Sequence, residues 1–75
     1  MGKAITHKHI LRKFGQKLQR IRKSKGISQE DLAADLSLHR NYIGMIERGE
    51  RNPTIRTLYK IAKALKVKSS ELLPF

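Results

Sequence analysis

The sequence contains no cysteine and no tryptophan, and only two of its 75 residues are proline. The lack of cysteine excludes disulfides and thiolate metal sites, two devices that often stabilise small domains. A chain of this length buries only about 60% of its unfolded surface, so its stability is marginal. Self-association is the remaining way to bury more surface.

Long apolar runs are also absent. No stretch approaches the roughly 18 apolar residues of a membrane helix, and the first residues lack the apolar core of a signal peptide. Together with the missing disulfides, this pattern favours a cytoplasmic, nucleoid-associated protein without a membrane partner.

Acidic residues are scarce, and none is arranged for catalysis. Six Asp and Glu stand against 17 Lys and Arg, and no acid forms a recognisable pair with a nucleophile. His7 and His9 are near neighbours, but two histidines make a poor metal site. We therefore expect no enzyme activity, no metal and no cofactor.

The formal net charge of +11 at pH 7 indicates a polyanionic partner. Nucleic acid is the first candidate and an anionic membrane surface the second. A merely solvated basic surface ranks lower, because the charges have an arrangement. RNA recognition commonly uses exposed stacking aromatics, and aromatic residues make up only 5% of this chain. Double-stranded DNA is the expected ligand.

Apolar residues recur at helical spacing and predict an all-α fold without strands. A basic, flexible arm is expected over residues 1–8 and a folded domain over 9–75. The five expected helices cover about 9–25, about 29–36, about 39–48, a segment that follows Thr54, and a last short turn at "SELL".

Several residues are typical of helix ends. Ser28, Thr54 and Ser69 are N-cap candidates, and Gly26 closes the first helix as a C′ residue. Gly15 lies inside the first helix, where glycine costs about 1 kcal/mol relative to alanine. Its presence there predicts close packing against a neighbouring element.

Residues 29–48 have the pattern of a helix-turn-helix, in which two short helices are joined by three or four residues. The second helix is polar on its outer face, whereas Ile43 and Ile46 point the other way. The outer residues are Arg40, Asn41, Gly44, Met45 and Arg48.

The segment "GISQEDLAADLSLHRNYIGMIERGERNPTIRTLYKIAKAL" resembles the phage-repressor-like (Cro/CI, or XRE) family of bacterial regulators. The resemblance covers about residues 14–73 and implies a five-helix, lambda-repressor-like DNA-binding domain. Within the family the segment is most similar to small controller proteins of restriction–modification systems, which are single-domain dimers that regulate their own operon. Ser37 departs from the pattern, since the family often has glycine there.

The outer face of the third helix is the expected site of base readout, because the N-terminal part of this helix enters the major groove. Arg40 suits guanine and Asn41 suits adenine, and a good bidentate pair discriminates by roughly 1–3 kcal/mol. Met45 either covers a thymine methyl or fills a gap. Gly44 is expected to let the backbone approach the DNA.

Phosphate contacts position such a protein without reading sequence. The resemblance implies this role for Gln29, and the helix N-terminus at Thr54 offers further donors. His39 either contacts phosphate or only caps its helix. The remaining candidates line the exit of the third helix: Tyr42, Arg48, Arg51 and Asn52. A further set near the N-terminus either follows phosphates or is disordered: Lys3, Lys8, Arg12 and Lys13.

Two charged residues are expected to be structural. Glu47 follows Ile43 by four residues and Arg22 follows Leu18 by four, so both face inward. The resemblance implies that Arg22 and Glu47 pair and tie the first helix to the third.

One such domain reads few base pairs, so two copies related by a dyad are expected to read a palindromic operator. The candidate dimer surface is apolar: Ile55, Tyr59, Val67, Leu72, Leu73 and Phe75. Leu72 alternatively completes the core.

The predicted function is a homodimeric transcriptional regulator that binds double-stranded DNA in a sequence-specific way. It would repress by blocking RNA polymerase or activate by touching it, and the sequence leaves both open. The resemblance implies autoregulation of a restriction–modification operon. The alternative is an antitoxin or another partner-binding module with a secondary DNA-binding face.

Overall fold

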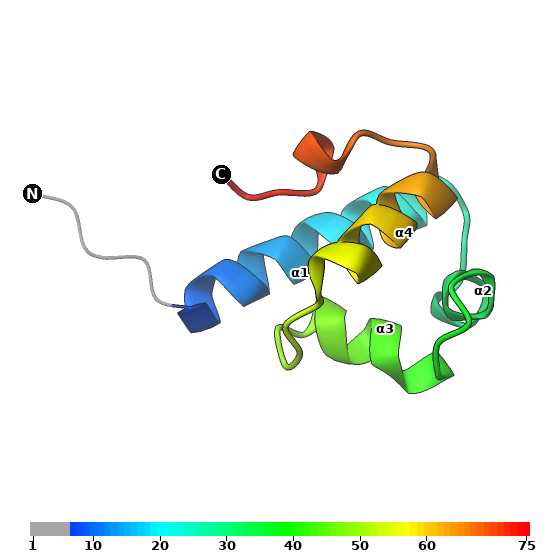
Figure 1. Ribbon diagram of the computed structural model, residues 1–75, viewed down its shortest axis with the longest axis horizontal. Coiled ribbons are helices and arrows are strands. Elements are labelled where there is room, and N and C mark those ends of the chain that lie inside the picture. The colour runs from blue at the N-terminus through cyan, green and yellow to red at the C-terminus, as the bar shows by residue number, and fades with distance from the viewer. Residues whose placement is uncertain (1–6) are drawn as a thin grey trace, which may run out of the picture.

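A computed structural model describes residues 7–75, and within this range the chain forms four α-helices and one 3₁₀ turn (Figure 1). In chain order they are α1 (His7–Ser24), α2 (Gln29–Asp35), α3 (Arg40–Glu47), α4 (Ile55–Leu65) and η1 (Ser69–Glu71). The all-α prediction is confirmed for the described residues, and the helices of the helix-turn-helix lie where the sequence pattern places them.

The prediction of a fifth helix is wrong, because the segment forms only a single 3₁₀ turn of three residues, η1. Pro74 disfavours helical backbone at the residue before it, which prevents the turn from continuing. Ser69 does not cap this turn either. Lys68 is the N-cap, and its backbone N–H donates to the Glu71 carboxylate at 2.9 Å.

The N-terminal end of α1 also differs from the prediction. The helix begins at His7, so Lys8 belongs to α1 rather than to a preceding arm. Residues 1–6, which include Lys3, lie outside the described residues.

The predicted caps at three helix ends are present. Ser28 Oγ accepts the Asp31 N–H at 3.0 Å, and Thr54 Oγ1 accepts the Thr57 N–H at 3.1 Å. Gly26 has φ +69° after α1, in the left-handed region that glycine adopts without strain. Ser37 has φ +57° in the turn between α2 and α3, so this turn is formed at a modest conformational cost.

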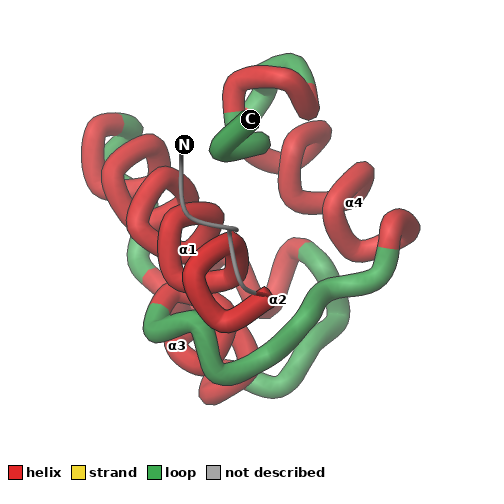
Figure 2. Tube along the Cα trace, turned by 90° about the vertical axis from the view of Figure 1, so that its left-hand side faces the viewer, coloured by secondary structure: helices red, strands yellow, loops and turns green. Residues whose placement is uncertain are grey.

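The helices surround one apolar core, to which every helix contributes. Figures 1 and 2 place α3 below α1 and α4, and the C-terminal segment above them. The exposed side of α3 therefore lies on the opposite side of the domain from the C-terminal segment. The buried apolar residues are Phe14, Leu18, Leu32, Ala33, Leu36, Ile43, Ile46, Ile61, Ala62, Leu65 and Leu72.

Leu72 corrects one of the predicted dimer contacts. Its side chain is fully buried in this core, so it is not available at a surface. The C-terminal segment turns back over the core, and Lys17 Nζ fixes it by donating to the Leu73 carbonyl oxygen at 3.0 Å. The alternative role, completion of the core, is the one that the structure shows.

α1 and α3 approach each other closely at Gly15. A Cβ atom on Gly15 would lie 2.5 Å from the carbonyl oxygen of Glu47 and 2.7 Å from its carbonyl carbon. Both atoms are backbone, so neither can move aside without shifting α3. The close packing predicted from the helical glycine is confirmed.

Gly15→Ala is therefore expected to destabilise the domain by up to about 2 kcal/mol. The strain of overpacking, typically about 1–3 kcal/mol, exceeds the gain of about 1 kcal/mol in helix propensity. Urea unfolding measures this change, and Gln16→Ala, at the exposed neighbour on the same helix, is the control. A Gly15→Ala protein more stable than the wild type would contradict the close packing.

Candidate nucleic-acid interface

The two sides of α3 have opposite chemistry. Ile43 and Ile46 are fully buried, because α3 packs against α2 and α1 on this side. Arg40 and Asn41 are exposed on the outer side and Met45 is half-buried. The structure thus brings the three predicted base-reading side chains onto one accessible face of a single helix.

Arg40 at the start of α3 is only loosely paired. Its Nη1 lies 3.8 Å from Glu30 Oε2, and both side chains are 72% exposed. Such an exposed ion pair contributes little energy. The guanidinium is therefore free to exchange Glu30 for another acceptor.

Gly44 lies in a different environment from the expected one. It is buried, and a Cβ atom there would lie 3.1 Å from Arg48 Nη1 and 3.4 Å from Gln29 Oε1. The missing side chain makes room for these two polar side chains to lie across α3. Gly44 thus permits a close approach of Gln29 and Arg48 in the free protein, and the approach of its backbone to DNA stays a prediction.

A buried charge network joins three helices at the Glu47 carboxylate. Arg22 Nε donates to Glu47 Oε2 at 2.6 Å and Arg22 Nη2 donates to Oε1 at 3.1 Å. The remaining guanidinium nitrogen, Nη1, donates to the Ile27 carbonyl oxygen at 2.7 Å. Gln29 and Gln19 donate their side-chain amides to Oε1 at 2.8 and 3.4 Å. The structure therefore places Arg22 and Glu47 together and adds two amides that sequence reasoning missed.

Those two amides had different signals in the sequence. Gln19 precedes Arg22 by three residues, which places both on one face of α1, so its contact was accessible to helical spacing. Gln29 was singled out only for phosphate. Its amide nitrogen carries two hydrogens, and Glu47 accepts one of them. The second hydrogen is not used in that bond.

His39 caps α3. Its Nδ1 accepts the Asn41 N–H at 3.2 Å, and the backbone of His39 is extended, as is typical of an N-cap residue. The imidazole is exposed at the start of the helix. Of the two predicted roles, capping is the one that uses a contact within the chain.

The exit of α3 carries two exposed arginines, one paired with the exposed Glu50 and the other placed over the half-buried Tyr42. Arg48 Nε donates to Glu50 Oε2 at 2.9 Å and Arg48 Nη2 to Oε1 at 3.2 Å. This hydrogen bonding lowers the pKa of Glu50 and raises the pKa of Arg48 from their usual values. The Arg51 guanidinium lies 5.6 Å from the centre of the Tyr42 ring. Asn52 is exposed beside them, before the cap of α4 at Thr54.

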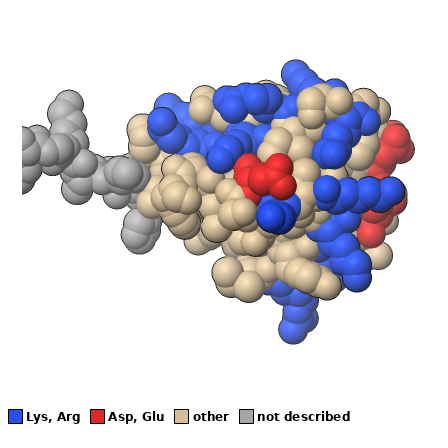
Figure 3. Space-filling view, turned by 90° about the horizontal axis from the view of Figure 1, so that it is seen from above, with Lys and Arg blue, Asp and Glu red and all other residues tan. Residues whose placement is uncertain are grey.

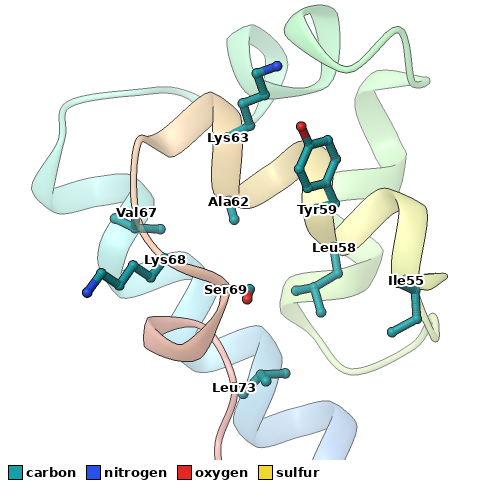
Figure 4. Close-up of a pocket in the computed structure, with 9 residues that line it drawn as sticks. All are labelled: Ile55, Leu58, Tyr59, Ala62, Lys63, Val67, Lys68, Ser69 and Leu73. Carbon is teal, nitrogen blue, oxygen red and sulfur yellow. The ribbon is translucent and has the colours of Figure 1, made fainter.

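An apolar groove of about 800 Å³ lies between α4 and the C-terminal segment (Figure 4). Large apolar side chains stand exposed along it and beside it, with Ile55 and Phe75 80% exposed and Tyr59 60% exposed. Val67 and Leu73 are half-buried in its lining. These five predicted dimer residues thus share one accessible region, from which Leu72 is absent.

Neither a candidate metal site nor a membrane-spanning helix is present in residues 7–75. Residues 7–75 contain no cluster of three or more His, Asp or Glu side chains that could hold a metal ion. Within the same range, no helix combines the length and the apolar character that crossing a membrane requires.

Residues 18–72, which include both helices of the motif, match the helix-turn-helix family over most of the chain. The chain belongs to this family. It is 52% identical over 63 residues to the control protein C.BamHI of Bacillus amyloliquefaciens, covering 83% of this chain and 78% of that protein. It is 44% identical over 61 residues to the control protein C.MunI of a Mycoplasma species, covering 80% of this chain and 82% of that protein.

The family's solved structures share the fold. The crystal structure of the restriction-modification controller protein C.AhdI from Aeromonas hydrophila superposes with a TM-score of 0.81 at 46% sequence identity. The superposition covers 84% of this chain and 96% of the C.AhdI chain. The resemblance to phage-repressor-like regulators, and within them to controller proteins, is confirmed.

The buried network predicts that Arg22→Ala is a folding defect. Removing one partner of a buried ion pair typically costs about 3–5 kcal/mol, because the other charge is left buried without a counter-ion. Thermal unfolding followed by circular dichroism measures the loss. Arg20→Ala, at an exposed arginine of the same helix, is the matched control. Wild-type stability in Arg22→Ala, with only DNA affinity lost, would overturn the structural role.

Proposed function

We propose that this protein is a transcriptional regulator that binds double-stranded DNA in a sequence-specific way, as a homodimer on a palindromic operator. The observation that carries the proposal is the outer face of α3, where Arg40 and Asn41 are exposed while Ile43 and Ile46 are fully buried. A helix with this division fits the major groove, whose base edges its outer side chains meet. The match to control proteins supports a role in regulating a restriction–modification operon.

Base readout falls to the N-terminal part of α3. Arg40 donates in a bidentate way to O6 and N7 of a guanine, and Asn41 pairs with the corresponding edge of an adenine. Met45, half-buried on the same face, contacts a thymine methyl. Because the contact between Arg40 and Glu30 is long and exposed, little energy is lost when a base replaces the carboxylate.

Phosphate contacts surround this helix. Gln29, at the N-terminus of α2, donates its second amide hydrogen to one phosphate. Arg51, Asn52 and the N-terminus of α4 contact another phosphate. Arg48 exchanges Glu50 for phosphate on binding, since their pair is exposed. These contacts fix the register of α3 in the groove and carry no sequence information.

Dimerisation uses the apolar region formed by Ile55, Tyr59, Val67, Leu73 and Phe75. Exposed apolar surface of this kind, on a small domain that has little of it to spare, is typical of an interaction site. A second copy of the chain covers it and places two α3 helices one helical turn of DNA apart, about 34–36 Å. The bound dimer, in the cytoplasm at the nucleoid, then either blocks RNA polymerase or contacts it.

Selection of bound duplexes from a random pool tests the function directly. The wild type is expected to recover a consensus with two-fold symmetry. Arg40→Ala is expected to lose the preference for one base pair in each half-site, by about 1–3 kcal/mol, because its bidentate contact is gone. Recovery of no consensus at all by the wild type would refute sequence-specific binding.

Arg51→Ala is the matched control for readout in the same selection. This variant is expected to recover the wild-type consensus while binding every duplex more weakly, with a salt dependence reduced by about one unit of log–log slope for each protomer bound. Identical behaviour of the Arg40 and Arg51 variants on operator and random DNA would remove the readout assignment.

Ile55→Ser tests the dimer surface. Each copy loses the burial of one large apolar side chain, about 1.5 kcal/mol, so the dimer is expected to dissociate on the order of a hundredfold more readily. Sedimentation equilibrium measures this shift, with Arg56→Ser, at an exposed neighbour outside the groove, as the control. A monomeric wild type that co-purifies with a small protein would instead favour a partner-binding module such as an antitoxin.

A further inference from the structure

α1 lies close to the exit of α3 at Gly49. A Cβ atom on Gly49 would lie 3.0 Å from the Cα of Arg12, 3.1 Å from its backbone nitrogen and 3.4 Å from its Cβ. The backbone of Gly49 is left-handed, with φ +76°, so the chain leaves α3 pressed against α1. The base of the Arg12 side chain is therefore fixed beside the loop that follows α3.

The surroundings of Gly49 are rich in cations assigned to phosphate. Arg48 precedes it and Arg51 follows it by two residues, and both are exposed. Arg12 is exposed as well. On the same side of α1, Gln19 donates to Glu47 in the last turn of α3. This side of α1 therefore borders the C-terminal half of α3.

Charge alone does not single out this position. Figure 3 shows Lys and Arg side chains spread over the face that lies away from α3. Lys13, the next residue along the chain, belongs to the other side of α1, where it lines a hollow together with Pro74 and Phe75 of the C-terminal segment. Arg12 thus lies beside the exit of α3, whereas Lys13 lies beside the C-terminal segment.

We propose that Arg12 is a phosphate-contacting residue that extends the DNA-binding surface from the helix-turn-helix onto α1. The proposal rests on the proposed DNA-binding function and deepens it. Arg12 lies outside residues 18–72, so the match to the family does not assign this role. Its guanidinium grips two phosphate oxygens at once beside Arg48 and Arg51, and it adds affinity for every duplex without reading bases.

The test compares salt dependence in the full-length chain. Arg12→Gln is expected to reduce the log–log slope of affinity against salt by about 0.9 for each protomer bound, which corresponds to about eightfold weaker binding per protomer at about 0.1 M salt. The probe is a duplex of the sequence that the wild type selects, with a scrambled duplex beside it. Both duplexes are expected to lose affinity by the same factor. Glutamine keeps the backbone and Cβ atoms that touch Gly49, so the melting temperature is expected to stay unchanged.

Arg20→Gln is the matched control, since it removes the same charge from an exposed position of α1 that has no part in the proposed DNA or dimer surface. It is expected to leave the slope close to that of the wild type, and Arg12→Lys, which restores the charge, is expected to recover most of the lost slope. Equal losses in Arg12→Gln and Arg20→Gln, or a wild-type slope in Arg12→Gln, would overturn the proposal. A wild type that binds no duplex would instead refute the proposed function, so the two failures are distinguishable.

Discussion

The buried carboxylate of Glu47 is the point on which the arrangement of the helices depends. It sits in the last turn of α3 and receives hydrogen bonds from Arg22 of α1 and from Gln29 at the start of α2. The same guanidinium holds the Ile27 carbonyl oxygen in the connection between α1 and α2. One charge pair therefore sets the position of α3 relative to both of its neighbours. An isolated helix as short as α3, with eight residues, is not stable in water, so α3 owes its existence to these contacts and to its buried side.

This dependence explains why α3 is free to be polar on its outer side. The apolar side of α3 and the Glu47 network supply its stability, and the exposed residues contribute little to it. Arg40 and Asn41 are consequently open to variation without loss of the fold. On the proposed function, a protein built in this way can change which operator it reads while it keeps its core, because readout and stability then reside on opposite sides of one helix.

The four α-helices, the caps at Ser28 and Thr54 and the helix-turn-helix followed from the sequence because each is a local property of spacing and residue type. The last turn was the local exception, since Lys68 rather than Ser69 caps it. Elsewhere the sequence left out what a tertiary neighbour decides. Helical spacing put Gly44 on the outer face, but only the fold shows that the side chains of Gln29 and Arg48 cover it. Leu72 was apolar and near the end of the chain, and only the path of the C-terminal segment shows that it fills the core. The sequence predicted only phosphate as the partner of the Gln29 amide. Its hydrogen bond to Glu47, 18 residues away, could not be predicted from helical spacing.

The pair between Arg48 and Glu50 has a kinetic consequence on the proposed function. The Glu50 carboxylate has to separate from Arg48 whenever Arg48 binds a phosphate. This requirement is the same at every position along a chromosome. Genomes present about 10⁶–10⁹ unrelated binding positions for each operator. Because the pair is exposed and contributes little energy, the exchange shortens each stop only slightly, and by the same factor at the operator as at unrelated positions.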